Sequence, residues 1–138
     1  MFEETNKYKQ QGNFFFQKGN SLTAQSSGVP DLPGVYYIMR LAKGKIDLVY
    51  IGRSGSMIQS GQLKEQTLNG RINNKQNGMK RQLYFEQKMT EENIEALDIY
   101  WFVTMDNENR DLPGYVEGLL MQRYFDVHGK LPLWNVCF

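Results

Sequence analysis

Three short segments of the chain are apolar and rich in β-branched or aromatic residues, which is typical of strands. Residues 34–38 and 49–55 form the first two, and the polar connection between them has a glycine at its centre. This arrangement predicts a β-hairpin. Residues 97–104 form the strongest strand pattern in the chain. We expect this third segment to be the central partner of the hairpin, which gives a three-stranded antiparallel sheet.

Other segments carry apolar residues at helical spacing. Residues 64–74 and 79–89 predict two helices separated by Asn77-Gly78. A longer amphipathic helix is predicted to follow Asp111, a cap candidate, and to end at Gly129. The expected fold is therefore a small α/β (α+β) domain, with a three-stranded antiparallel sheet flanked by helices.

Alternation along the predicted strands decides which side chains share a face of the sheet. In the first strand Tyr36 and Tyr37 point in opposite directions, so only one of them can face a given site. In the second strand we expect Val49 and Tyr50 to lie on opposite faces. A single strand tyrosine is more often an ordinary structural residue than a catalytic one.

Residues 1–29 show little periodicity and are expected to be an N-terminal extension of a domain that spans residues 30–138. Within the extension, residues 14–16 are a compact apolar run. That run could add a strand or pack over the core. The extension could also act as an accessory arm for a substrate or a partner.

Composition narrows the class of protein. The chain has 138 residues, 41% of them hydrophobic, with one cysteine and one histidine, which excludes a zinc cluster and a multi-histidine mechanism. No apolar run approaches the ~20 residues of a membrane span, and there is no signal-peptide pattern at the N-terminus. We therefore expect a cytoplasmic protein with no membrane partner.

Charge is unevenly distributed along the chain. The net charge is +1, but residues 1–90 hold 13 Lys and Arg against 6 Asp and Glu (+7), whereas residues 91–138 hold 3 against 9 (−6). A basic face can neutralise phosphates even when the whole chain is balanced. On charge alone, an ordinary solvated surface explains these lysines equally well.

The two predicted hairpin strands carry a pair of tripeptides, Gly34-Val35-Tyr36 and Tyr50-Ile51-Gly52. Together they resemble the two half-motifs of the GIY-YIG nuclease superfamily, with Val35 at the usual Ile. Arg71, Glu117 and Asn135 fall where that family keeps its other active-site groups. The resemblance extends over residues 32–135.

This resemblance implies a DNA endonuclease that hydrolyses phosphodiester bonds with a single Mg²⁺ or Mn²⁺. Tyr36 or Tyr50 would be the general base, and which of the two takes the proton stays open. Arg71 would stabilise the phosphate, Glu117 would be the metal ligand, and Asn135 would support the site. The family commonly has His or Tyr one helical turn after the arginine, where this chain has Lys75.

Further polar residues near these motifs are candidates for substrate binding: Arg53, Ser54, Lys75, Lys80 and Arg81. The expected partner is DNA, with specificity supplied by a second copy of the chain, by a separate targeting partner, by the N-terminal arm or by DNA structure. The alternative is a non-catalytic nucleic-acid-binding or interaction module on the same scaffold. In that case Arg71 would be a surface cation, and Glu117 would only complement a helix dipole.

Overall fold

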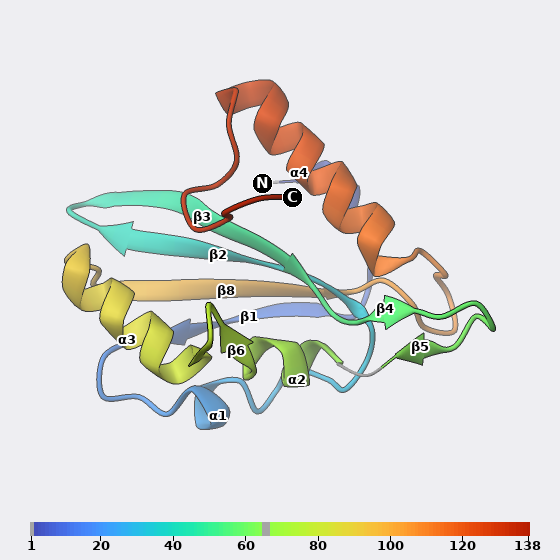
Figure 1. The fold of residues 1–138 in the computed structure, drawn as a ribbon, viewed down its shortest axis with the longest axis horizontal. Coiled ribbons are helices and arrows are strands. Elements are labelled where there is room, and N and C mark those ends of the chain that lie inside the picture. The colour runs from blue at the N-terminus through green and yellow to red at the C-terminus, as the bar shows by residue number, and fades with distance from the viewer. Residues whose placement is uncertain (1, 65–66) are drawn as a thin grey trace.

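The computed structural model describes residues 2–64 and 67–138. Its main sheet is antiparallel throughout and has four strands in the order β1-β8-β2-β3. These strands are β1 (Gln11–Phe16), β8 (Ala96–Val103), β2 (Gly34–Ala42) and β3 (Lys45–Arg53). The predicted mixture of helices and an antiparallel sheet is confirmed, and β8 does pair with the hairpin. The prediction of three strands is wrong, because β1 adds a fourth strand at the outer edge of β8 (Figure 1).

The N-terminal residues contribute to the sheet and to the core. The Phe14-Phe15-Phe16 run forms the end of β1, and Phe16 is fully buried. A 3-10 turn η1 (Glu3–Thr5) precedes β1, and the short helix α1 (Leu22–Gln25) follows it. Leu22 packs in the same cluster as Phe16. The sheet would therefore lose an edge strand and part of its core without this segment.

The β2–β3 hairpin is longer than predicted. Its turn consists of only Lys43 and Gly44, with φ angles of 53° and 72°. Left-handed conformation at both central residues is what a two-residue hairpin turn requires. The polar side chains on both sides of the turn belong to the strands and not to a loop.

A β-bulge interrupts the hairpin at Val49. Ile38 pairs with Tyr50, the next pair is Met39 with Leu48, and Val49 has no partner on β2. Val49 and Tyr50 consequently pack into the same cluster, so the prediction that they lie on opposite faces is wrong. The extra residue lets Leu48 and Ile51 both reach the cluster on the other face.

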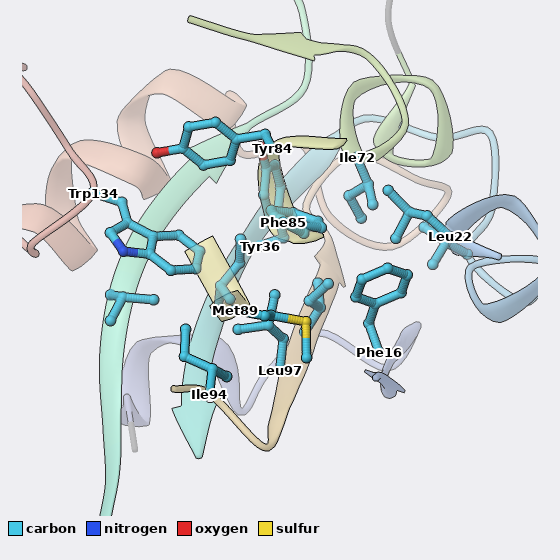
Figure 2. Packing of buried hydrophobic residues seen from close by; sticks show 14 of the residues in the cluster. Phe16, Leu22, Tyr36, Ile72, Tyr84, Phe85, Met89, Ile94, Leu97 and Trp134 are labelled. Atoms are coloured by element: carbon cyan, nitrogen blue, oxygen red, sulfur yellow. The ribbon is translucent and has the colours of Figure 1, made fainter. Parts of the chain in front are cut away.

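Helices cover both faces of the sheet. The long helix α4 (Pro113–His128) packs on the face that carries Val35 and Tyr37. The opposite face, which carries Tyr36, is covered by α1, by α2 (Leu68–Ile72) and by α3 (Arg81–Glu91) (Figure 1). Figure 2 shows Tyr36 within this second core, among Phe85, Met89 and Leu97.

The region between β3 and α3 differs most from the predictions. The helix predicted over residues 64–74 is limited to α2, and residues 65 and 66 lie outside the described part of the chain. Before it, β4 (Ser56–Met57) pairs with β5 (Leu63–Lys64). After it, β6 (Lys75–Gln76) and β7 (Met79–Lys80) form a small hairpin, because Asn77 and Gly78 both adopt positive φ, 52° and 76°.

The sequence predicted the C-terminal end of helix α4 correctly but not its N-cap. Gly129 terminates it in the left-handed conformation that a helix C-terminus favours, with φ 68°. Its N-cap is Leu112 and not Asp111. The Asp111 carboxylate instead accepts the Tyr8 hydroxyl at 2.6 Å and pairs with Lys7 at 2.6 Å. Among the described residues, no helix has the length and apolar character needed to cross a membrane.

Candidate active site between two tyrosines

Tyr36 on β2 and Tyr50 on β3 lie on the same face of the sheet, with ring centroids 6.0 Å apart. Tyr36 pairs across the strands with Gly52. A Cβ atom at Gly52 would lie 2.6 Å from the Tyr36 hydroxyl oxygen and 2.8 Å from Cε2 of Tyr50. Only glycine therefore allows the two phenol rings to pack over this position.

The glycine of the first tripeptide is also required sterically. A Cβ atom at Gly34 would overlap the carbonyl oxygen of Phe102 and come within 2.8 Å of Leu68. The Gly34 amide donates to the Ser54 hydroxyl oxygen at 2.8 Å, and the Ser54 amide donates to the Gly34 carbonyl at 2.9 Å. Ser54 is buried, so its hydroxyl holds β2 to the end of β3 and does not lie at the surface, where a substrate contact was expected.

Arg81 lies in the core beneath the tyrosine pair, although the sequence suggested a surface cation. Its side chain is 1% exposed, and its guanidinium carbon is 5.6 Å from the Tyr36 ring centroid, 5.4 Å from that of Tyr50 and 5.8 Å from that of Phe85. Across the described residues, neither its Nε and Nη1 atoms nor the Tyr36 hydroxyl forms a well-aligned hydrogen bond. The guanidinium and the Tyr36 phenol nevertheless lie close enough to interact, and although burial lowers the pKa of Arg81, this contact raises it.

One sequence signal could have placed Arg81 correctly. Arg81, Tyr84, Phe85 and Met89 follow helical spacing and are the buried residues of α3. Arg81 therefore begins the apolar stripe of that helix. The neighbouring Lys80, in contrast, is exposed.

Arg71 and Glu117 approach the tyrosine pair from two other elements, α2 and α4. Burial raises the pKa of Tyr50, as does the neighbouring Tyr36, whereas the positive charges of Arg81 and Arg71 lower it. The pKa of the Glu117 carboxyl is raised by burial and lowered by Arg53 and Arg71. Arg71 thus acts on both Tyr50 and Glu117, which places the three groups in one electrostatic neighbourhood.

Arg53 pairs with Glu117 and is not simply a free cation for substrate. Its Nε atom is 3.6 Å from Oε1 of Glu117, with side-chain exposures of 43% and 15% respectively. The first turn of α4 accommodates the guanidinium because Gly114 lacks a Cβ, which would overlap Nη1 of Arg53. The end of β3 and the start of α4 are held together at this point.

No described contact joins Asn135 to the tyrosine rings. Its side chain instead forms hydrogen bonds with β3, the strand that carries Tyr50. Its side-chain oxygen accepts the Ile51 amide at 3.0 Å, and its nitrogen donates to the Ile51 carbonyl at 3.0 Å. The preceding Trp134 amide donates to the carbonyl of the bulged Val49 at 2.8 Å. These hydrogen bonds from the half-buried Asn135 and from Trp134 cover the free edge of β3.

Lys75 and Lys80 lie directly opposite each other on the β6–β7 hairpin, and both are exposed. Like charges at paired positions repel each other. No carboxylate within residues 2–64 and 67–138 forms an ion pair with either lysine. The hairpin therefore presents two uncompensated positive charges to solvent.

Metal ligands are sparse at this site. The described part of the chain contains no group of three or more His, Cys, Asp or Glu side chains that could hold a metal ion. Among the described residues, a divalent ion at Glu117 would therefore find fewer than three such side chains and would take most of its ligands from water or substrate.

Comparison with known proteins gives no match: no family model, no curated protein and no solved structure is significantly similar to this chain.

Proposed function

We propose that this chain is a divalent-metal-dependent DNA endonuclease of the GIY-YIG type. The observation that carries the proposal is the convergence of Tyr36, Tyr50 and Arg71 with Glu117, from four separate elements, in one electrostatic neighbourhood. The two tripeptides and the uncompensated lysines of the β6–β7 hairpin support it.

Phosphodiester hydrolysis needs a group that takes a proton from water and a group that meets charge on the phosphate oxygens. A tyrosine in its phenolate form can take the proton. Arg71 offers a planar pair of N–H donors that matches two phosphate oxygens. The side chains of Lys75 and Lys80 would hold flanking phosphates through charge alone.

The Glu117 carboxylate is suited to bind a hard divalent ion together with substrate phosphates and water. Mg²⁺ is commonly bound through one or two carboxylates together with substrate phosphates, and it keeps several waters. A single, partly buried carboxylate beside the phosphate-binding arginine meets that requirement. When bound, such an ion would supply Lewis-acid stabilisation of charge on the phosphate. Arg53 is the competing partner of the same carboxylate.

The direct test is incubation of the purified protein with supercoiled plasmid in Mg²⁺ or Mn²⁺, with EDTA as the control. The proposal expects time-dependent nicking or linearisation with metal and none with EDTA. A panel of duplex, branched and single-stranded DNA would then define the substrate. Absence of cleavage on every substrate and with both metals would contradict the proposal.

A non-catalytic nucleic-acid-binding module is the second candidate, and two observations favour it. The Tyr36 hydroxyl is buried without access to solvent, and the Glu117 carboxylate is already paired with Arg53. Such a module would bind DNA with a strong salt dependence but would not cleave it, so the plasmid assay combined with a binding titration separates the two functions.

A further inference from the structure

Arg81 differs from the three arginines that form a described ion pair. Arg40, Arg53 and Arg123 each pair with a carboxylate. Arg81 is more deeply buried than these three, yet no carboxylate in the described part of the chain pairs with it. Its guanidinium lies instead among aromatic rings, and the Tyr36 and Tyr50 phenols stabilise its charge.

Stability alone does not explain such a residue. An unpaired buried charge costs free energy, and a hydrophobic residue of similar volume at such a position is often as stable or more stable. Cation–π contacts recover part of that cost. The position nevertheless lies on the apolar stripe of α3, where methionine would continue the pattern of Tyr84, Phe85 and Met89.

The rings that the guanidinium faces belong to the candidate active site. Tyr36 and Tyr50 both lie within 5.6 Å of it, measured to the ring centroids. The other charged groups that act on Tyr50 are Arg71 from α2 and Glu117 from α4. Among the positive charges, Arg81 has the larger effect on Tyr50, ahead of Arg71.

We propose that Arg81 is a positioning residue for the tyrosine pair: its guanidinium fixes the orientation of both rings, and its charge favours the phenolate form of the tyrosine that accepts the proton. This role rests on the proposed endonuclease function. Two other cations close in sequence to the site are less suited to it, because Arg53 pairs with Glu117 and Lys75 is exposed on the β6–β7 hairpin.

The charge of Arg81 and the burial of the site have opposite effects on the pKa of Tyr50. Burial raises the pKa of Tyr50, and the positive charge of Arg81 partly offsets that effect. Removal of the charge should therefore make the phenol harder to ionise. An opposite charge at close range typically shifts a pKa by roughly 1–3 units, so a measurable displacement is expected.

The test is a site-specific titration that needs neither DNA nor metal. We would place 3,5-difluorotyrosine, whose phenol is much more acidic than that of tyrosine, at position 50 and follow its ¹⁹F resonance against pH in the parent, in Arg81→Met and in Arg81→Lys. In Arg81→Met the midpoint at position 50 should rise by about one unit or more. In Arg81→Lys it should stay closer to that of the parent, because the charge is kept.

Lys88→Met is the matched control. Lys88 is on the same helix and lies over a different tyrosine, Tyr84, at 5.7 Å from the ring centroid. Its removal should leave the fluorotyrosine midpoint at position 50 unchanged. If Arg81→Met does not fold, Arg81→Gln provides a second neutral side chain for the same comparison.

Two outcomes separate this role from a purely structural one. A rise in midpoint in a neutral variant whose unfolding temperature is no lower than that of the parent supports the role. An unchanged midpoint at position 50, with or without loss of stability, overturns it. If the parent cleaves DNA but the midpoint does not move, only the role of Arg81 fails. If the midpoint moves but the parent does not cleave, the coupling of Arg81 to Tyr50 stands and its catalytic meaning fails with the proposed function.

Discussion

At the scale of single residues, the two tripeptides are explained by what their glycines touch. Gly52 leaves room for the phenol rings of Tyr36 and Tyr50, and Gly34 leaves room for the backbone of β8. Arg81 fills the space beneath the same rings. The glycine of the second tripeptide is therefore a steric requirement of the tyrosine pair, whereas the glycine of the first is a requirement of the close approach of β2 to β8 and Leu68.

Replacement of Gly52 by alanine should destabilise the protein, because the new Cβ would lie 2.6 Å from the Tyr36 ring carbon and hydroxyl. Overpacking of a core typically costs about 1–3 kcal/mol. Urea unfolding followed by fluorescence measures this cost. Gly28→Ala is the control, because a Cβ at Gly28 meets no atom within 4 Å. Equal stability of both variants would show that the rings move aside freely.

Replacement of Glu117 by glutamine should change how stability depends on pH. Burial raises the pKa of this carboxyl above its usual value of 4.5, so the folded state favours the protonated form. The contribution of Glu117 is most favourable below pH 4.5 and is lost as pH rises through the folded pKa. Because glutamine does not ionise, Glu117→Gln does not lose stability in this way as pH rises. The free energy of unfolding of Glu117→Gln, relative to the parent, should thus increase between pH 4 and pH 7. A decrease over that range would show that Arg53 and Arg71 outweigh burial.

At the scale of elements, hydrophobic periodicity predicted the hairpin, β8, α3 and α4, because each buries a regular set of side chains. It missed features that depend on contacts distant in sequence. The bulge at Val49 appears only when β3 is aligned with β2. The apolar run at residues 14–16 allowed either a strand or packing over the core, and only its pairing with β8 decides for a strand, β1. Residues 75–80 are too short for any periodic signal.

At the candidate site, too, local sequence patterns were informative, whereas contacts between residues distant in sequence were not predicted. The resemblance of the tripeptides identified Tyr36 and Tyr50, which the structure brings together. Charge alone could not show that Arg81 is buried and Lys80 exposed, since the two differ only in which way they face at the start of α3. Burial of Ser54 depends on its bond to Gly34, twenty residues earlier in the chain.

Removal of the Asn135 side chain should open the edge of β3 behind Tyr50. In Asn135→Ala both hydrogen bonds to Ile51 are lost, at a cost of about 1–3 kcal/mol if the backbone groups stay buried. Amide hydrogen exchange at Ile51 should accelerate, whereas exchange within β1, at the other edge, should not. Unchanged exchange at Ile51 would mean that another group protects this amide.

At the scale of the whole molecule, the bipolar charge suggested by the sequence needs revision. Not every cation of the basic segment, residues 1–90, is available to phosphates. Arg40 pairs with Asp47 and Glu92, and Arg81, a predicted substrate-binding residue, is buried. Among the exposed cations, Lys75 and Lys80 lie on the side of the sheet covered by α2 and α3, whereas Lys43 and Lys45 lie at the far tip of the β2–β3 hairpin (Figure 1).

The Lys75→Ala, Lys80→Ala double variant should bind any DNA sequence more weakly than the parent does. The slope of log K against log salt should fall by roughly 2, about 0.9 for each phosphate contact that is lost. The Lys43→Ala, Lys45→Ala double variant removes the same charge at the distant turn and should change the slope little. Fluorescence anisotropy over a salt titration gives both slopes. A larger effect at the distant turn would place the DNA on that end of the hairpin.

The most direct test of the proposed endonuclease is the initial rate of plasmid cleavage in Mg²⁺ by Glu117→Gln, measured beside Asp126→Asn. Both variants replace a carboxylate of α4 by its amide, but Asp126 is exposed and contacts only Gln122 among the hydrogen bonds of the described residues. We expect Glu117→Gln to be folded and to lose at least about 100-fold in rate, the scale on which removal of one electrostatic contact to a transition state acts. Asp126→Asn should cleave at the parental rate. Parental cleavage by Glu117→Gln, or loss of cleavage in both variants alike, would contradict a catalytic site at Glu117.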